Sequence, residues 1–452
     1  MTARRPPSTT LAAAGLCSAA ALVPLNSTMI AVALLDIERD LDVSVGAVTW
    51  LVSGYLVVMA LAQPLGGRLG DALGHRRAFL AGLGAFLTAS ALATFAPWFA
   101  ALVALRMAQA LFGGLMSPSA AALLRDIVPA ERRGRLFGWF GTVMGLAAAV
   151  GPVIGGGLVA AFGWRAIFLV NLPVGAVAIT MAARALPRDP ERRVGGMRFD
   201  LRGAAAFTGF MGALVAALFL ATDGPARWVP AVAAAALLLG LFIRTERRAR
   251  DPFVALSLFD RRPYVGATAT VLLHNLVMYS LLLIIPILAE RELDLGPSGA
   301  GLLLGAMTGA MMLISPVGGH LSDRLGRRTP VAIGAAITVV ATIGLVIEAA
   351  SPTVVATAVL VATAGIGVGM AGASLQTTAV ESAPSEMVGV ASGVFMTVRY
   401  TGGIAAAGLA SAVASSGSFM SGFVVLAVAA GLSFLTAGAL AGAPRTVGEA
   451  LP

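Results

Sequence analysis

Long apolar stretches follow one another through this whole chain of 452 residues, and they constrain its fold more than any other feature. A helix needs about 20 apolar residues to cross the hydrocarbon core of a bilayer, and fourteen stretches approach or exceed that length. We place the spans at 11–35, 47–66, 78–96, 99–124, 136–162, 165–184, 203–222, 228–243, 264–289, 299–320, 330–348, 353–378, 388–414 and 419–442. Only 12% of the residues are charged, whereas a soluble domain is about 25% charged. The sequence therefore predicts an all-α, polytopic membrane protein with fourteen transmembrane helices.

The basic residues, all of them arginine, predict how these helices are oriented. If the N-terminus is cytoplasmic, 25 of the 31 arginines fall in cytoplasmic segments, four fall in external loops and two lie inside spans. Positive charge gathers on the cytoplasmic side of short loops in membrane proteins. The bias predicts an even number of spans, both termini in the cytoplasm and a place in the cytoplasmic (inner) membrane.

Composition excludes several other kinds of site. The single cysteine, Cys17, lies in the first apolar stretch, so one chain forms neither a disulfide nor a cysteine-based metal centre. Three histidines are too few for a histidine-rich metal centre, and no soluble basic face accompanies the net charge of +9. We expect no cofactor, no metal, no nucleic acid and no obligatory protein partner. The expected partners are the lipid bilayer and a small-molecule substrate.

A short segment rich in glycine and charge occurs twice and reveals an internal duplication. The segment QPLGGRLGDALGHRR at 63–77 matches SPVGGHLSDRLGRRT at 315–329 in eight of fifteen positions. The first copy follows the second predicted span and the second copy follows the tenth, so the two halves are offset by eight helices. Two parallel repeats of six helices are typical of secondary transporters. The offset therefore leaves two extra helices between the repeats.

The duplication divides the chain into four parts. We expect an N-terminal six-helix bundle at 1–185 and a region of cytoplasmic linkers with two additional transmembrane helices at 186–262. A C-terminal six-helix bundle at 263–443 and a short cytoplasmic tail at 444–452 follow. Basic residues on both sides of the extra helices favour the cytoplasmic position of the linkers.

Five segments, in this order along the chain, resemble motifs of the major facilitator superfamily and of its fourteen-span drug/proton antiporters. They are GGRLGDALGHRR after the second span, LRMAQALFGGLMSPS at 105–119, GPVIGGGL at 151–158, WRAIFLVNLPVG at 164–175 and FDLRG at 199–203. The resemblance covers nearly the whole chain. It implies the major facilitator fold, with two six-helix bundles and here two extra central helices. It also implies export of drugs or antibiotics in exchange for protons.

The duplicated segment is the first candidate functional site. We expect Asp71 to begin a turn and to pair with an arginine, so that the pair breaks as the two halves rock. The alternative is a packing turn whose arginines only set topology. A phosphate-binding loop is excluded, because no strand precedes the segment and no Gly-Lys-Ser/Thr sequence follows it. The candidate gating residues are Gly67, Asp71, Gly74, Arg76, Arg77, Gly319, Asp323, Gly326 and Arg328.

Glycine and proline are concentrated in the fifth predicted span, where the sequence resembles the antiporter motif. Small residues let helices approach closely in membranes, so we expect a tightly packed, bendable helix that seals one side of a cavity and restricts leak. The residues that carry this motif are Gly151, Pro152, Gly155 and Gly156.

Two arginines are predicted inside spans, where a charge is costly unless it faces a partner or a cavity. Arg106 lies with Gln109 in the fourth span, and the resemblance implies a role for this arginine in proton coupling. The alternative is a structural bridge to backbone carbonyls. Arg399 lies near the middle of the thirteenth span, where it either contacts an anionic or hydrogen-bonding substrate group or anchors neighbouring helices.

The ninth span carries polar residues on two faces. His274 and Met278 share one face through their i,i+4 spacing, and Asn275 and Tyr279 share another. His274 is suited to carry a proton at physiological pH, and the alternative is a hydrogen-bonded packing residue. The substrate or coupling candidates in this span are His274, Asn275 and Tyr279.

No acidic residue is placed securely in the middle of a predicted span. The related antiporters commonly have Leu-Asp-x-Thr in the first span, where this chain has Asn26, which cannot titrate. If protons are coupled, Asp36 at the external end of that span, His274 or Asp71 must carry more of the role. The missing carboxylate also disfavours lipophilic cations as substrates and favours neutral or anionic compounds.

These features predict a secondary active transporter that exports small amphipathic compounds by alternating access, in exchange for protons. One alternative is transport of a neutral or anionic metabolite without proton antiport. A second, from another class, is a polytopic lipid-modifying enzyme, which needs a clustered nucleophile, base or metal set that the sequence does not show. A channel needs a polar stripe along its spans, which these spans lack. We therefore expect no enzymatic activity.

Overall fold

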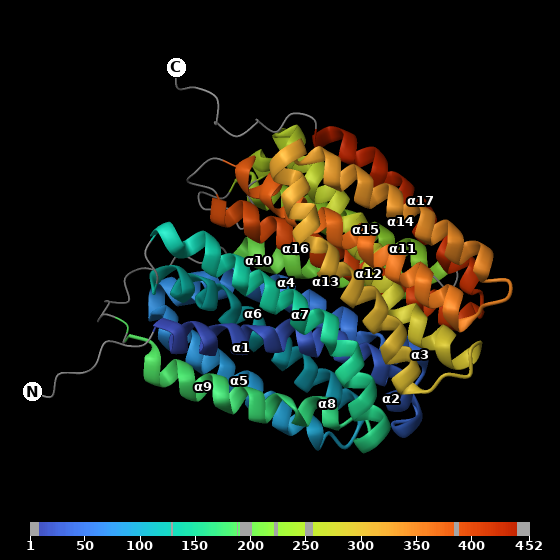
Figure 1. The fold of residues 1–452 in the computed structure, drawn as a ribbon, viewed down its shortest axis with the longest axis horizontal. Helices are drawn as coiled ribbons and strands as arrows, with labels where there is room; N and C mark the ends of the chain where they lie inside the picture. The colour runs from blue at the N-terminus through green and yellow to red at the C-terminus, as the bar shows by residue number, and fades with distance from the viewer. Residues whose placement is uncertain are drawn as a thin grey trace, which may run out of the picture.

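The computed structural model describes residues 9–127, 130–187, 189, 201–220, 225–248, 256–383 and 388–440. Within these residues every regular element is a helix. A bilayer offers no hydrogen-bond partners to the backbone, so a spanning segment must satisfy its own N–H and C=O groups. The N-terminal helices, blue to green in Figure 1, and the C-terminal helices, yellow to red, form two bundles of roughly aligned helices.

The N-terminal bundle contains six long helical segments joined by short ones. The long helices are α1 (Thr9–Met29), α4 (Trp50–Leu73), α5 (His75–Thr94), α6 (Phe99–Asp126), α7 (Ala130–Phe162) and α9 (Asn171–Ala185). The short elements are η1 (Ile30–Ala33), α2 (Leu34–Asp40), α3 (Val45–Val48) and α8 (Ala166–Leu169). The predicted external end of the protein is the end that contains α2, α3 and α8, on the right in Figure 1.

The C-terminal bundle repeats this arrangement. Its long helices are α12 (Arg262–Arg291), α13 (Pro297–Leu325), α14 (Arg328–Glu348), α15 (Val354–Glu381), α16 (Val388–Ser416) and α17 (Phe419–Ala437). The short elements η3 (Leu256–Asp260) and η5 (Gly438–Leu440) flank it. The predicted tail at 444–452 lies outside the described residues.

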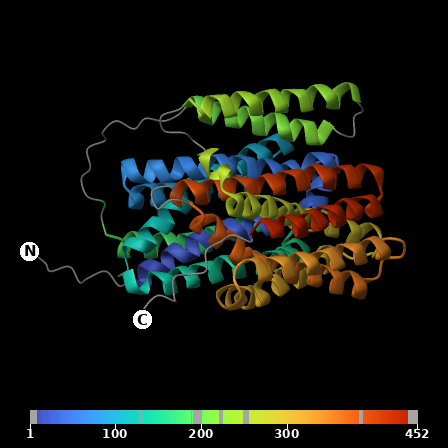
Figure 2. The same ribbon diagram turned by 90° about the horizontal axis from the view of Figure 1, so that it is seen from above.

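Two further helices, α10 (Leu201–Phe219) and α11 (Pro225–Glu246), form a hairpin that Figure 2 shows set apart from the two bundles. The hairpin is held together in part by Phe207 and Phe242, whose ring centroids are 5.4 Å apart. Its inner helix, α10, packs against α4 and α16. The outer helix exposes large apolar side chains such as Leu237, which suits a surface that faces lipid.

The all-α architecture of the predicted spans is confirmed, and each of the fourteen predicted spans overlaps one or more of the described helices. Twelve of the described helical segments are long and apolar enough to cross a membrane. The other two predicted spans correspond to α10 and α16, which are not among these twelve. The count of fourteen crossings stays a prediction.

The duplicated segment is more helical than the sequence predicts. We expected Asp71 to begin a turn, but α4 continues to Leu73 and only Gly74 separates it from α5. Gly74 has φ of 97°, in a region that residues with a Cβ rarely adopt. Because Gly74 alone makes the turn, the residues before it can remain helical. Asp71 therefore lies in the last turn of α4, and this prediction was wrong.

Candidate functional site

Arg106 of α6 is fully buried inside the N-terminal bundle. Its Nε donates to the carbonyl of Leu51 at 3.2 Å, and its terminal groups donate to the carbonyl of Asn26 at 3.1 Å, to Oε1 of Gln109 at 3.2 Å and to Oδ1 of Asn26. The guanidinium carbon also lies 4.1 Å from the ring centroid of Tyr55. None of these partners is a carboxylate. Arg106 is thus a buried cation that neutral oxygens and an aromatic ring stabilise.

The fold of α1 supplies part of this cage. The first span changes from α-helix to the 3₁₀ segment η1 at Ile30, four residues after Asn26. A 3₁₀ segment alters the i→i−4 hydrogen-bond ladder, and the carbonyl of Asn26 accepts from Arg106. The sequence placed Asn26 and Arg106 in the candidate set separately, and the structure brings them into contact.

Gln109 extends the cage to two more helices. Its Nε2 donates to Oγ of Ser90 at 2.8 Å, which also accepts from Nδ2 of Asn171 at 2.8 Å. The Ser90 hydroxyl in turn donates to the carbonyl of Phe168 at 3.0 Å. This buried network joins α5, α6 and α9, so it fixes the position of Arg106 within its bundle.

In the C-terminal bundle, the two polar faces of α12 contact different helices. Asn275 accepts from Nε of Arg399 on α16 at 3.3 Å, while Tyr279 packs against Gly403 on the same helix. His274 instead faces α17, where Oγ of Ser433 lies 3.1 Å from its Nδ1, and that nitrogen also lies 3.1 Å from the carbonyl of Thr270. The predicted separation of the faces is therefore present in the structure.

Tyrosines mark the interface between the bundles, and two of them, Tyr55 and Tyr400, are not among the residues predicted from the sequence. The chain has four tyrosines, and three of them lie within electrostatic range of one another across α4, α12 and α16. Nε2 of Gln63 donates to the hydroxyl of Tyr400 at 3.0 Å, which links α4 to α16. We call this group of residues the seam: Tyr55, Gln63, Tyr279, Arg399 and Tyr400. Apart from the scarcity of tyrosine in the chain, nothing in the sequence indicates that these tyrosines from distant segments lie together.

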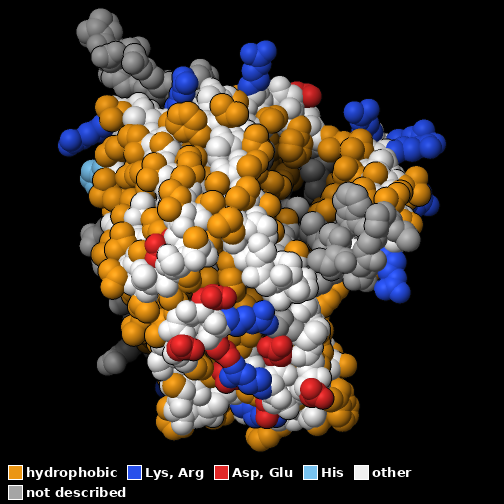
Figure 3. Space-filling view, turned by 90° about the vertical axis from the view of Figure 1, so that its right-hand side faces the viewer, with side chains coloured by type: hydrophobic (Ala, Val, Ile, Leu, Met, Phe, Trp, Pro, Cys, Tyr) orange, Lys and Arg blue, Asp and Glu red, His pale blue; other side chains and the backbone are white. Residues whose placement is uncertain are grey.

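Ion pairs gather at the predicted external end. Arg39 of α2 forms an ion pair with Glu290 of α12, across the two bundles, and its guanidinium lies 3.9 Å from Asp36. Asp40 accepts from Nε1 of Trp164 at 3.0 Å and pairs with Arg165 at 2.7 Å. Figure 3 faces this end and shows side chains of both charges gathered over its lower part. The bundles are therefore joined by charge here.

Helix α7 uses the antiporter-like motif to contact two helices at once. A Cβ on Gly155 would lie 3.1 Å from the backbone of Met29 on α1, and Gly151 also packs closely against α1. On the other face, a Cβ on Gly156 would lie 2.7 Å from the carbonyl of Pro297, and one on Gly301 would lie 2.6 Å from that of Pro152. Backbone contact of this kind requires small residues, so the predicted tight packing of this helix is present.

The N-terminal copy of the duplicated segment is held by a residue from outside it. The backbone N–H groups of Arg76 and Arg77 donate to the carboxylate of Asp189 at 3.0 and 2.9 Å, at the start of α5. The side chain of Arg76 donates to the carbonyl of Ala183. The contacts of Gly67 and the side chains of Asp71 and Asp323 are not among those that the structure describes, so their predicted gating roles stay predictions.

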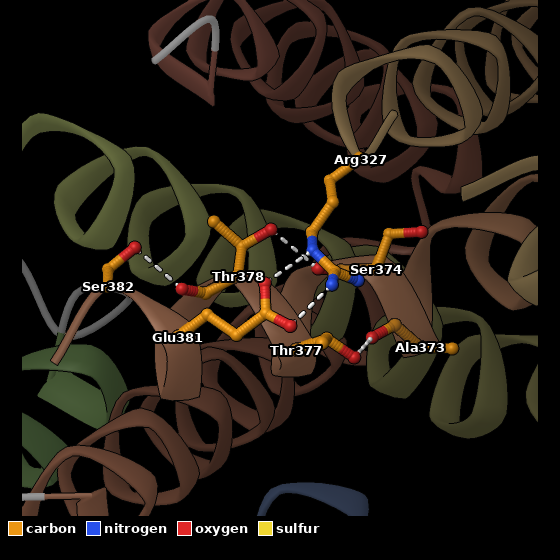
Figure 4. Close-up of polar contacts among 7 residues, drawn as sticks. All are labelled: Arg327, Ala373, Ser374, Thr377, Thr378, Glu381 and Ser382. Atoms are coloured by element: carbon orange, nitrogen blue, oxygen red, sulfur yellow. Dashed lines mark hydrogen bonds and ion pairs between the residues drawn. The ribbon is translucent and has the colours of Figure 1, made fainter. Parts of the chain in front are cut away.

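The C-terminal copy is held by an ion pair within its own bundle. Arg327 donates to both carboxylate oxygens of Glu381 at the end of α15, with distances of 2.8 and 2.5 Å (Figure 4). Gly326 forms the turn with φ of 82°, whereas a Cβ on Gly319 would meet no atom within 4 Å. Arg328 is exposed at the start of α14. Neither copy, nor any other part of the described chain, contains a cluster of His, Cys, Asp and Glu that could hold a metal.

Comparison with known proteins identifies the class of this fold. Residues 16–407 match the model of the Major Facilitator Superfamily. The chain is 34% identical over 392 residues to the uncharacterized MFS-type transporter YvkA of Bacillus subtilis (strain 168), covering 86% of this chain and 87% of YvkA. The chain belongs to the Major Facilitator Superfamily, and it is a multi-pass membrane transporter rather than an enzyme.

Two further comparisons concern an export protein of similar sequence and a transporter of similar fold. It is 32% identical over 385 residues to the tetracenomycin C resistance and export protein of Streptomyces glaucescens, covering 84% of this chain and 71% of that protein. The crystal structure of the peptide transporter POT in complex with sulfate has a TM-score of 0.72 and 16% identity, covering 97% of this chain and 95% of that one. At that identity the likeness concerns the fold alone.

Proposed function

We propose that this protein exports small amphipathic compounds of the drug or antibiotic type across the cytoplasmic membrane. The observation that carries the proposal is the likeness to a resistance and export protein over most of the chain. The resemblance of the α7 segment to the antiporter motif supports export rather than uptake. The close contact of α7 with α13 packs the two bundles against each other. Both termini lie in the cytoplasm in this proposal, as the arginine distribution predicts.

Transport proceeds by alternating access of the two bundles. In this structure α7 packs against α13, and Oγ1 of Thr308 donates to the carbonyl of Ala149 at 2.6 Å across the bundles. The ion pair between Arg39 and Glu290 joins the bundles at the predicted external end. Opening that end requires this pair to break, so it biases the protein toward the state closed to the outside.

We further propose exchange for protons, as the resemblance to drug/proton antiporters implies. The cage of Arg106 contains no acidic partner among the described residues, so it supplies no carboxylate to titrate. The candidates that bind the proton are then His274, which is buried where α12 meets α17, Asp36, which is partly exposed beside Arg39, and Asp71 near the end of α4. Asn26, Gln109, Asn275, Tyr279 and Arg399 are substrate or coupling candidates in this scheme.

The proposal is tested in a host that lacks its own drug pumps. Cells that express the protein should accumulate less of at least one compound in a panel of antibiotics and dyes than cells that carry an empty vector. A protonophore should abolish the difference. If no compound is exported at normal expression, the export function is wrong; if export continues in the protonophore, proton exchange is wrong.

The ion pair at the predicted external end has its own test. The substitution Glu290→Gln removes the charge of Glu290 while preserving the size of the side chain. We expect it to raise the rate at which a membrane-impermeant reagent labels positions near the predicted external end. The matched control is Glu348→Gln, which lies at the predicted external end of α14 and contacts Thr353 in its own bundle. Equal labelling of both variants would contradict a closing role for Glu290.

A further inference from the structure

The seam between the bundles offers hydrogen-bond donors for which none of the described residues supplies an acceptor. The hydroxyl of Tyr55 is buried, with only 1% of the residue exposed, and none of the described residues forms a hydrogen bond with it. Arg399 uses Nε for Asn275, and none of the described residues accepts from its two terminal amino groups. The hydroxyl of Tyr400 accepts from Gln63, which leaves its own hydrogen without a described acceptor. A buried donor without a partner is costly, so the buried hydroxyl of Tyr55 points to an acceptor that arrives with a ligand. The partly exposed Arg399 and Tyr400 supply further donors in the same seam.

The charge of this region has one sign. Arg106 lies against one face of the Tyr55 ring, 4.1 Å from its centroid. Arg399 lies within electrostatic range of Tyr400, which lies within range of Tyr55. The described seam residues include no carboxylate; Gln63 and Asn275 supply only neutral amide oxygens. Two arginines without a described acidic partner create a positive potential in a region of low dielectric constant.

The aromatic rings set the shape of the ligand that fits these donors. Tyr279 packs its ring against Gly403, where a Cβ would lie 3.0 Å from the ring, and the tyrosines of α4 and α16 lie near it. Aromatic rings stack on planar aromatic groups with a gain beyond their buried area. Since Arg106 already covers one face of Tyr55, a ligand cation near that ring meets repulsion rather than a free aromatic face.

We infer that the seam binds planar aromatic compounds that carry carbonyl, phenolate or carboxylate oxygens, and that it rejects organic cations. This inference rests on the proposed export function and names the substrate class of the same protein. Arg399 donates to the ligand oxygen from α16, and Tyr55 donates from α4. The ligand therefore contacts both bundles, which is the arrangement that couples binding to their movement.

The test compares two dyes with the same ring system in proteoliposomes. Fluorescein is anionic and rich in acceptors at neutral pH, whereas tetramethylrhodamine methyl ester is a cation of similar size. Counterflow, in which unlabelled compound inside drives uptake of the dye, needs no ion gradient and is independent of proton coupling. We expect fluorescein counterflow to be at least about tenfold faster than that of the cation, the ratio that one charge-assisted hydrogen bond supplies.

Variants assign the preference to the seam. Arg399→Gln should lower fluorescein counterflow about tenfold, Arg399→Lys should retain the preference for the anion, and Tyr55→Phe should lower counterflow several-fold. Tyr264→Phe is the matched control, because this fourth tyrosine donates to the carbonyl of Ala391 inside the C-terminal bundle. Insertion and the size-exclusion profile of each purified variant verify that it is folded.

Three results would contradict these expectations in distinguishable ways. Equal or faster counterflow of the cation overturns the substrate class but leaves export intact. A preference that Arg399→Gln and Tyr55→Phe leave unchanged shows that other residues select the substrate, and it overturns the seam as the site. Absence of transport for both dyes and for the whole compound panel overturns the export function itself, and the substrate class with it.

Discussion

The two copies of the duplicated segment can be compared residue by residue. In each copy a glycine with positive φ ends one helix at the turn into the next: Gly74 at 97° and Gly326 at 82°. In each copy an earlier glycine lets two helices touch through their backbones. A Cβ on Gly66 would lie 2.5 Å from the carbonyl of Leu115 on α6, and one on Gly318 would overlap the carbonyl of Met370 on α15.

The copies differ in what holds the turn. The N-terminal turn is fixed by Asp189, which comes from the segment after α9 and accepts from the first N–H groups of α5. The C-terminal turn is fixed by the pair of Arg327 with Glu381 inside one bundle. The shared glycines therefore form a packing and turning unit, while the residues that differ connect that unit to different surroundings. Among the described contacts, the N-terminal copy alone is linked to the segment that leads toward the extra hairpin.

The largest loss of stability should follow substitution of the packing glycines, which both copies share. Gly66→Ala and Gly318→Ala each place a methyl group against backbone, and we expect each to cost about 3 kcal/mol of stability. Thermal unfolding of the purified variants measures this. Gly319→Ala is the control, since its Cβ meets no atom within 4 Å, and it should be neutral or slightly stabilising. A stable Gly66→Ala protein would contradict the packing role.

Substitution of the glycine at the turn should lower stability by different amounts in the two copies. Gly326→Ala meets open space and costs only its unfavourable φ, about 1 kcal/mol. Gly74→Ala costs about 2 kcal/mol, because its Cβ would also lie 2.5 Å from a carboxylate oxygen of Asp189. In the background Asp189→Gly, which also removes the Cβ of residue 189 that would lie 2.7 Å away, the cost of Gly74→Ala should fall to that of Gly326→Ala. Equal costs in all three cases would show that Asp189 does not constrain the turn.

The smallest effect concerns the ion pair of the C-terminal copy. Glu381→Gln should lower stability by about 1 kcal/mol, because the pair is bidentate but Glu381 is 41% exposed and therefore screened by solvent. High salt should reduce the difference between this variant and the native protein. Asp294→Asn, an exposed residue in the loop between α12 and α13, is the control and should change stability by only a few tenths of a kcal/mol. A loss that is unchanged by salt would contradict the electrostatic explanation.

Much of the fold could be predicted from the sequence, because the relevant signals are local. Apolar length located the spans, and the repeated glycines located corresponding turns in the two halves. The turn itself was mispredicted, since polar residues such as Asp71 favour turns in water but are compatible with the end of a long membrane helix. Bundle architecture followed from the eight-helix offset between the copies.

The contacts between bundles could not be predicted in the same way. Spacing along α12 placed Asn275 and Tyr279 on one face, but it could not show that this face meets α16. The positions of Tyr55 and Tyr400 depend on how two bundles pack, and no periodic pattern within one helix encodes that. Asp189 is likewise a single carboxylate in a linker, so its contact with α5 appears only in three dimensions.

The central claim is that the two bundles must separate at the predicted external end for transport to occur. Gly46 of α3 and Ser411 of α16 face each other across the bundles there, with 3.0 Å between a Cβ at Gly46 and Oγ of Ser411. This spacing suits a disulfide. In a protein whose native cysteine is removed by Cys17→Ala, the pair Gly46→Cys and Ser411→Cys should cross-link under oxidation.

The most direct test measures dye counterflow by this cross-linked protein. The control is Val413→Cys with Gly422→Cys, which joins α16 and α17 within one bundle. We expect the cross-link between bundles to abolish counterflow, a reductant to restore it, and the cross-link within the bundle to leave it intact. Full counterflow by a protein that is completely cross-linked between Gly46→Cys and Ser411→Cys would contradict alternating access of the two bundles.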